Sequence, residues 1–181
     1  QSISMGIDND DNDNFKISNS TSLTGTTYSD ANTMIRVHTE TGSEGIIDFN
    51  NQSRARAKRA IAQNIANATL SIVQYNVEDY DSKSEYNNGT YTFTVLEDGY
   101  YYVNASLAFQ STNQLATTEF IYLAVYVNGS NYAYLDRIYG TGNNIMYMVK
   151  GATIVYAVAG STIDIRVYQV SGQARDTQAD A

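Results

Sequence analysis

The chain has 181 residues, a formal net charge of −8, and 16 tyrosines but no proline, cysteine or tryptophan. The acidic balance argues against a nucleic-acid partner, because neutralising phosphates requires a basic face, and no apolar run approaches the roughly 20 residues of a membrane-spanning helix. Without cysteine no disulfide can form, so core burial and subunit association have to stabilise the fold.

Residues 1–52 form the first predicted region, which is acidic and holds short β-like pieces at 15–18, 34–38 and 45–49. Each piece is too short to bury a core within one chain, and several copies wrapped around one another are expected to bury one. The stretch 5–18, with a Gly-Ile-Asp-Asn opening, an Asp/Asn turn and a Phe-Lys-Ile-Ser strand, resembles shaft repeats of bacteriophage tail fibres. The resemblance implies a trimeric, β-stranded fibre shaft that precedes a receptor-binding tip.

The junction at 53–69 is rich in alanine and admits two interpretations. Ile61 and Ile65 stand four apart among good helix formers, as in a short amphipathic helix. The stretch 54–58 instead alternates basic residues with alanine, which is the period of a strand. We expect a strand here, with a junctional helix as the alternative.

The second predicted region, 53–181, is a head of alternating strands that ends in a polar tail. The expected strands are 68–76, 90–96, 100–109, 120–127, 132–139, 145–149, 152–158 and 163–170. Turn signals separate them, including Asn128-Gly129 and Lys150-Gly151. Regular short strands of this kind predict a sandwich or barrel. The run 121–127 is apolar on both faces, which predicts that a partner subunit covers one of them.

The stretch 93–103 reads as a strand, a tight turn at Asp98-Gly99 and a second aromatic strand, because both turn residues tolerate positive φ. Its spacing, Phe-Thr-x-x-x-x-Gly-x-Tyr-x-Val, resembles the centre of the globular head domain of complement component one-q and the tumour-necrosis-factor relatives. The stretches 67–76, 126–129 and 159–168 resemble further parts of that domain in the same order.

This resemblance implies an all-β fold, a homotrimeric jelly-roll β-sandwich that binds other molecules and performs no chemistry. It also implies core or trimer packing for Phe93, Gly99, Tyr101, Val103, Tyr122 and Tyr126. The family's last strand, an aromatic-x-Gly segment, has no counterpart after Gly172. Residues 173–181 are polar and tail-like, so either the sequence is truncated or the sheet edge is closed in another way.

Residues that often carry chemistry are present without their usual partners. His38 is the single histidine, and Glu78, Asp79 and Asp81 lie on a predicted exposed loop. We therefore expect that the protein is not an enzyme and that it has no cofactor and no metal site. The cluster at 8–13 is expected to be a polar turn, with calcium binding as the alternative. The basic run 54–59 is expected to offset the acidic shaft rather than to bind an anion.

Receptor contacts are expected near the glycine-rich loop 140–144, where tyrosines cluster. Tyrosine combines a flat apolar ring with a hydrogen-bonding tip and few torsions to freeze, and asparagine adds directional hydrogen bonds. The predicted receptor-binding residues are Tyr132, Tyr134, Arg137, Tyr139, Asn143 and Asn144. A structural role is the alternative for each tyrosine.

The resulting hypothesis is the tip of a homotrimeric fibre, either a phage tail fibre or a bacterial adhesin. It would bind a cell-surface protein or glycan non-covalently, with no membrane insertion, from a virion surface or the extracellular space. The alternatives are a secreted complement-type ligand or lectin and a structural trimerisation cap. A polysaccharide hydrolase is a distant third.

Overall fold

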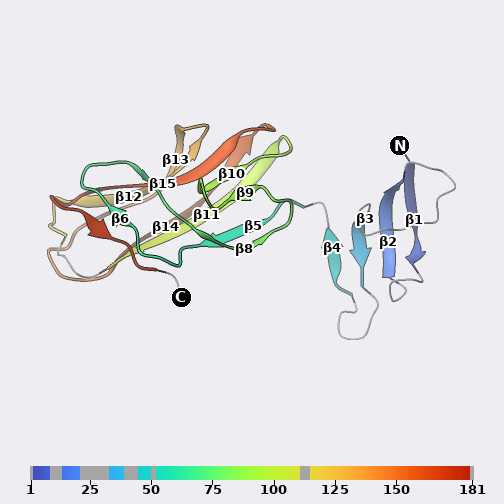
Figure 1. The fold of residues 1–181 in the computed structure, drawn as a ribbon, viewed down its shortest axis with the longest axis horizontal. Coiled ribbons are helices and arrows are strands. Elements are labelled where there is room, and N and C mark those ends of the chain that lie inside the picture. The colour runs from blue at the N-terminus through green and yellow to red at the C-terminus, as the bar shows by residue number, and fades with distance from the viewer. Residues whose placement is uncertain are drawn as a thin grey trace. The chain divides into compact units, whose positions relative to one another are not determined.

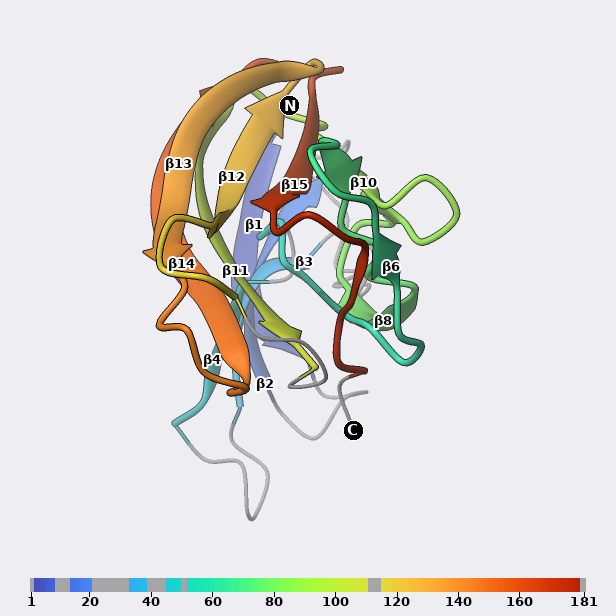
Figure 2. The ribbon, with the colours of Figure 1, turned by 90° about the vertical axis from the view of Figure 1, so that its left-hand side faces the viewer.

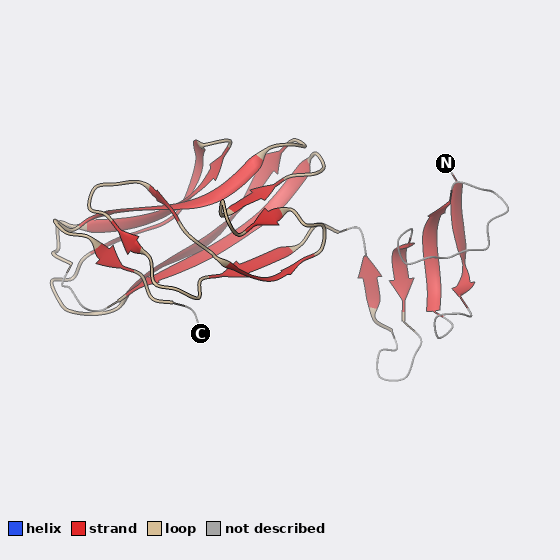
Figure 3. Ribbon diagram, viewed as in Figure 1, coloured by secondary structure: helices blue, strands red, loops and turns tan. Residues whose placement is uncertain are grey.

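The computed structural model of the chain describes residues 2–8, 14–20, 33–38, 45–49, 52–110 and 115–179. These residues form strands and turns and contain no helix (Figure 3), so none of them belongs to a helix that could cross a membrane. The expected all-β class is confirmed. The chain separates into two compact units, Gln1–Arg54 and Ala55–Ala181, which we describe one at a time.

The first unit is a four-stranded antiparallel sheet (Figure 1). Its strands, in spatial order, are β1 (Ser2–Asp8), β2 (Asn14–Ser20), β3 (Thr33–Val37) and β4 (Ile47–Phe49). The register places Met5 opposite Ile17, Ile17 opposite Ile35, and Ile35 opposite Phe49. Residues that are paired across strands share a face. One face of the sheet is therefore a continuous apolar row.

The residues one position further along these strands lie on the other face, because successive side chains of a strand point to opposite faces. This face carries charged residues. Here Lys16 pairs with Arg36, and Arg36 pairs with Asp48. The sheet of the first unit is thus amphipathic, with charged groups on one face, where Lys16 is buried, and apolar groups on the other.

The second unit is built around a six-stranded sheet that contains β7, β9, β10, β12, β13 and β15. The order β13-β12-β15-β10-β9 runs across it, and β7 also pairs with β15. The bounds are β7 (Ser71–Ile72), β9 (Tyr86–Asn87), β10 (Thr92–Thr94), β12 (Phe120–Val127), β13 (Ser130–Tyr139) and β15 (Thr162–Val170). In Figure 2, β13, β12 and β15 follow one another from left to right in this order.

The opposite layer consists of β11 (Gly99–Phe109) and β14 (Tyr147–Ala157), paired along their full lengths. Two short pairs flank it, β5 (Ala55–Lys58) with β8 (Val77–Asp81) and β6 (Asn64–Ile65) with β16 (Arg175–Asp176). Between the layers, Leu107 of β11, Leu123 of β12, Val149 of β14 and Val167 of β15 pack together fully buried. The second unit is a jelly-roll β-sandwich, as expected.

The turn predicted at Asn128-Gly129, which depends only on its own residues, is confirmed. Asn128 and Gly129 have φ of 50° and 76°, as a two-residue primed hairpin turn requires, and they join β12 to β13. The strand expected near residue 55 is also present as β5, and the junctional helix is absent from the described residues.

The expected hairpin at Asp98-Gly99 is wrong. β10 lies in the six-stranded sheet whereas β11 lies in the opposite layer, so the chain crosses the sandwich between them. Val95 is fully buried in this crossing, and the Asp98 side chain accepts a hydrogen bond from the backbone N–H of Ala159 at 2.8 Å. Asp98 therefore holds the neighbouring β14–β15 turn, and no strand reversal occurs.

The expected turn at Lys150-Gly151 is also wrong, because β14 runs through it without interruption. A Cβ added to Gly151 would lie 2.5 Å from the carbonyl oxygen of Leu135, a bulged residue of β13. The glycine is required because another strand approaches its backbone. The expected strand 68–76 shrinks to β7, and Ala68, at its expected start, has a φ of 51°, outside the range of a strand.

The described part of the predicted polar tail, 173–179, packs on the head. Thr177 is fully buried and bridges Phe109 of β11, and the N–H of Gln178 donates to the carbonyl of Ala108 at 2.8 Å. The Thr177 hydroxyl accepts from the N–H of Gln63 at 2.8 Å, which satisfies a buried donor. Residues 177 and 178 thus cover part of the β11 edge, for which no covering strand was predicted from the sequence.

Candidate functional site

The outer surface of the six-stranded sheet carries a cluster of aromatic side chains. On β12, Phe120 and Tyr122 alternate with the buried Ile121 and Leu123, so their rings point away from the core. We call the cluster the aromatic platform. Its members are Phe120, Tyr122, Tyr134, Arg137, Tyr139 and Tyr168.

The platform rings contact one another across three strands. Tyr122 of β12 and Tyr168 of β15 stack at 5.2 Å between ring centroids with an interplanar angle of 18°. Tyr134 of β13 meets Tyr122 edge-on at 5.1 Å, and Tyr139 lies 6.0 Å from Phe120. Each such pair adds about 0.5–1.5 kcal/mol beyond area burial. The rings therefore hold one another in place before any ligand arrives.

Arg137 stands within this cluster on β13. Its guanidinium carbon lies 4.0 Å from the centroid of the Phe120 ring and 5.1 Å from that of Tyr139. Both distances suit a cation–π contact. The neighbouring Asp136 accepts a hydrogen bond from the backbone N–H of Arg137 and not from its guanidinium.

A second arginine on the same face is neutralised. Arg166 of β15 holds Asp164 through two hydrogen bonds, at 2.6 Å from Nε and 3.1 Å from Nη2, and covers the ring of Tyr126 at 4.3 Å. The hydrogen bond to Asp164 raises the pKa of Arg166. Burial raises the pKa of Tyr122, and the nearby Tyr126 and Tyr134 raise it further, so its hydroxyl remains a donor at neutral pH.

The predicted receptor-binding residues divide into three places. Tyr134, Arg137 and Tyr139 belong to the platform. Tyr132 turns toward the other layer, where its hydroxyl accepts from the backbone N–H of Tyr156 at 3.2 Å. Asn143 and Asn144 are exposed in the loop between β13 and β14. The structure therefore brings three of the six together.

The platform also contains residues that the sequence prediction missed or placed elsewhere. Phe120 and Tyr168 were not among the candidates, and Tyr122 was expected in core or trimer packing. Period-two alternation puts Phe120 and Tyr122 on one face, but it does not say which face the core occupies. That choice emerges only when β12 and β15 pair.

The remaining residues expected in core or trimer packing lie in different parts of the head. Phe93, Tyr101 and Val103 pack against one hydrophobic cluster between the layers, with Phe93 and Tyr101 edge-on at 5.8 Å. Tyr126 is 8 % exposed and lies on the platform side, under Arg166. Gly99 begins β11 and has only the Tyr101 ring within 4 Å of its missing Cβ.

The outer surface of β11 and β14 forms a second exposed face, which we call the apolar face. It consists of Tyr100, Tyr102, Ile154 and Tyr156, which are paired across the two strands, and of Met148 near the start of β14, beyond the exposed Asn104 and Ser106. Tyr100 is 79 % exposed and Ile154 is 60 % exposed. Lys150 is the one charged side chain that points outward from these two strands.

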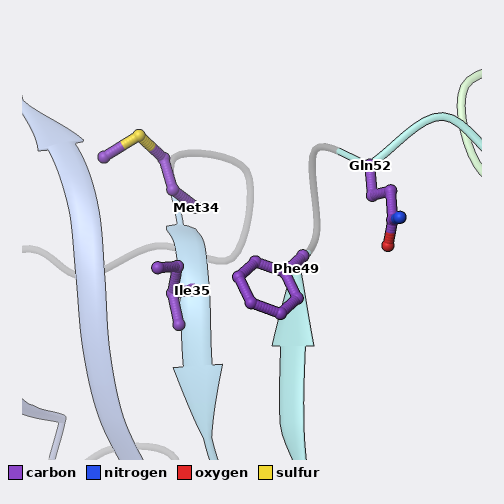
Figure 4. Close-up of a pocket in the computed structure, with 4 residues that line it drawn as sticks. All are labelled: Met34, Ile35, Phe49 and Gln52. Carbon is purple, nitrogen blue, oxygen red and sulfur yellow. The ribbon is translucent and has the colours of Figure 1, made fainter. Parts of the chain in front are cut away.

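The N-terminal sheet is exposed along its apolar row. Met5 is 66 % exposed and Phe49 is 51 % exposed. A shallow hollow in this unit is lined by Met34, Ile35, Phe49 and Gln52 (Figure 4). His38 bonds Asp48 at 2.7 Å between Nε2 and Oδ2, so this histidine is tied to a carboxylate of the same sheet.

The acidic residues considered for chemistry, Glu78, Asp79 and Asp81, lie on β8 and not on the expected exposed loop. Asp79 lies 3.2 Å from Arg56 and 3.5 Å from Lys58, and Asp81 accepts the N–H of Tyr86 at 2.6 Å. No group of three or more potential metal ligands occurs among the residues that the structure describes. The proposed calcium cluster falls mainly on residues 9–13, which lie outside the described residues.

Comparisons with known proteins give a likeness in structure. No family model and no curated protein matches the sequence. In structure, the chain is similar to the globular domain of zebrafish complement 1qA protein, with 14 % sequence identity and a TM-score of 0.41. The alignment covers 66 % of this chain and 92 % of that one. The proposals below therefore rest on the residues of this chain.

Proposed function

We propose that the chain is the tip of a homotrimeric fibre whose head recognises a cell-surface receptor or glycan without catalysing a reaction. The observation that carries the proposal is the uncovered apolar row of the N-terminal sheet. A sheet with an exposed apolar face is not stable alone in water, because folding has to remove that face from solvent. Further copies of the same chain supply matching apolar rows.

The apolar face of the head supports the same assembly. Contiguous exposed apolar surface on a soluble protein marks an interaction site. On the apolar face the outward residues of β11 and β14 include no carboxylate, although the chain carries 19 acidic residues. Copies of an acidic chain can approach through this face without opposing acidic groups. Aromatic side chains and methionine are also enriched in the centres of protein interfaces.

The aromatic platform is proposed as the recognition surface. It lies on the six-stranded sheet, the layer opposite the apolar face, so assembly through one layer leaves the other accessible. Tyrosine and arginine are the residues that most often dominate binding energy. Three identical platforms on one fibre raise the overall avidity above that of a single weak site.

The shaft-like sequence at 5–18 extends this proposal to a phage tail fibre or a bacterial adhesive fibre, displayed on a virion or outside the cell. A trimeric sheet array ahead of a binding head provides reach and rigidity. Self-association of both units as trimers would support a fibre over a soluble complement-type ligand.

The test uses the labelled full chain and a panel of intact bacterial cells that differ in surface polysaccharide. Tyr139→Ser, on the platform, is expected to lower cell binding at least tenfold. Tyr80→Ser, which removes an exposed tyrosine of β8, is the matched control and is expected to bind like the parent chain. Unchanged binding of Tyr139→Ser would contradict the proposed recognition surface.

A further inference from the structure

Arg137 carries a positive charge that no acidic side chain of the described residues offsets. The ion pairs described for the chain involve Asp48, Asp79, Glu97 and Asp164. None of them includes Arg137, whose guanidinium lies over the rings of Phe120 and Tyr139. Arg166, on the same face, is neutralised by Asp164. The platform therefore presents one unneutralised guanidinium.

The surroundings make this charge distinctive. The charged residues of β12, β13 and β15 are Asp136, Arg137, Asp164 and Arg166. Asp136 accepts the backbone N–H groups of Arg137 and of Lys150 on β14, and Asp164 pairs with Arg166, so Arg137 is the unpaired charge on this face of a chain of net charge −8. A guanidinium held by stacking presents its N–H donors in a fixed plane, which suits bidentate recognition of a carboxylate or sulfate. The group that Arg137 is suited to bind is therefore an anionic group of a ligand.

The aromatic neighbours specify the rest of the ligand. Tyr139 is 54 % exposed beside Arg137, and Tyr134 is 65 % exposed further along the same strand. A sugar ring has apolar C–H groups on its faces and hydroxyls around its rim. An exposed tyrosine matches both, since its ring packs on the C–H face and its hydroxyl bonds the rim.

The backbone around the platform argues against an extended peptide as the ligand. Peptides that bind sheets usually add a strand, and their affinity comes from main-chain hydrogen bonds at a free edge. β12 is paired with β13 on one side and β15 on the other along its whole length. β13 is the edge strand of the sheet, but its outer side lies against β14, where Leu135 meets Gly151 and Asp136 accepts the N–H of Lys150. Recognition there has to use side chains.

We propose that the platform binds an acidic saccharide, with the carboxylate or sulfate of one sugar held by Arg137 and that sugar's ring packed on Tyr139. This inference rests on the proposed function of the head as a recognition module, and it names the class of ligand. Each subunit of the fibre supplies one such site. The affinity of a single site is expected to be weak and salt-dependent, because the site is open to solvent.

The test measures binding of the full chain to immobilised oligosaccharides in matched pairs. The acidic members end in sialic acid, glucuronic acid or sulfated galactose, and the neutral members lack the acidic group. An acidic peptide of similar charge is included. The proposal predicts at least tenfold tighter binding to one or more acidic members than to their neutral partners, and separate responses to carboxylate and sulfate show which group is preferred.

Variants locate the site. Arg137→Gln is expected to reduce binding of the acidic member to that of its neutral partner, and Arg137→Lys is expected to restore it only in part, because lysine lacks the planar fork. Arg56→Gln, which removes an exposed arginine of β5, makes the same charge change elsewhere and is expected to bind like the parent chain.

The inference is overturned if no acidic oligosaccharide binds better than its neutral partner, if Arg137→Gln binds equally well, or if the acidic peptide competes on equal terms. These outcomes are separable from failure of the proposed function. Cells that bind the parent chain and the Arg137→Gln variant equally would remove the acidic-saccharide assignment, while recognition by the head would stand.

Discussion

Gly151 lies directly against the backbone of Leu135, so closely that a Cβ on Gly151 would lie 2.5 Å from the Leu135 carbonyl oxygen. The contact joins β14 to β13, the strands through which the two layers meet at one side of the sandwich. Two hydrogen bonds reinforce this junction, one from the N–H of Lys150 to Asp136 and one from the N–H of Tyr156 to the Tyr132 hydroxyl.

Gly151→Ala is expected to lower the free energy of unfolding by about 1–3 kcal/mol, because the added methyl group forces apart two strands that are fixed on both sides. The measurement is urea unfolding followed by tyrosine fluorescence. Gly99→Ala is the matched control, since its Cβ would meet only the Tyr101 ring at 3.9 Å, and a change within about 0.5 kcal/mol is expected. Equal stability of the two variants would contradict the close approach.

Thr177→Ala is expected to cost about 1–3 kcal/mol, because it leaves the buried N–H of Gln63 without its acceptor. Thr177→Ser retains the hydroxyl and is expected to recover most of the loss. Thermal unfolding of both variants measures the difference. Were residues 173–181 a solvated tail, neither substitution would change the melting temperature.

Alkaline pH is expected to destabilise the head through Tyr86. Burial raises the pKa of Tyr86 to about 12, above the ordinary tyrosine value of about 10, and its hydroxyl donates to the carbonyl of Tyr75 at 2.8 Å. The folded pKa lies above the unfolded one, so the neutral hydroxyl stabilises the fold fully below pH about 10 and this contribution is lost as the pH rises to about 12.

The free energy of unfolding should therefore fall between pH about 10 and 12, and it should fall less steeply in Tyr86→Phe. Urea titrations at a series of pH values measure both slopes. Tyr80→Phe changes an exposed tyrosine of the adjoining β8 and serves as the control. A slope that Tyr86→Phe leaves unchanged would show that Tyr86 titrates alike in the folded and unfolded chain.

Ile154→Glu is expected to weaken assembly, because it places a carboxylate at the centre of the apolar face, where association would bury it without a partner. Sedimentation velocity should show dissociation at concentrations where the parent chain stays associated. Tyr134→Glu introduces the same charge on the platform and should leave the association unchanged. If Tyr134→Glu weakened assembly and Ile154→Glu did not, the subunits would associate through the platform and not through the apolar face.

Sequence predicted what local chemistry decides and missed what distant strands decide. The Asn128-Gly129 turn follows from two residues that tolerate positive φ. Gly151 has a similar turn signature, but its reason is Leu135, which lies in another strand. Asp98 likewise bonds Ala159, 61 positions away, and the sequence gives no sign of that partner.

The candidate site shows the same division. Tyr134, Arg137 and Tyr139 were predicted because they lie near the loop 140–144 in the sequence. Phe120 and Tyr168 were missed because they join the platform only through the pairing of β12 with β13 and β15. The clearest overlooked signal was the period-two spacing of Tyr100, Tyr102, Ile154 and Tyr156, which marks one outward face.

The central claim, that copies of this chain cover one another's apolar surfaces, is tested most directly by the mass of the full chain in solution. Light scattering on the eluting species is expected to give about 60 kDa, three times the 20.0 kDa of one chain, and to hold that value on dilution. A stable species of 20.0 kDa with both units folded would contradict the account.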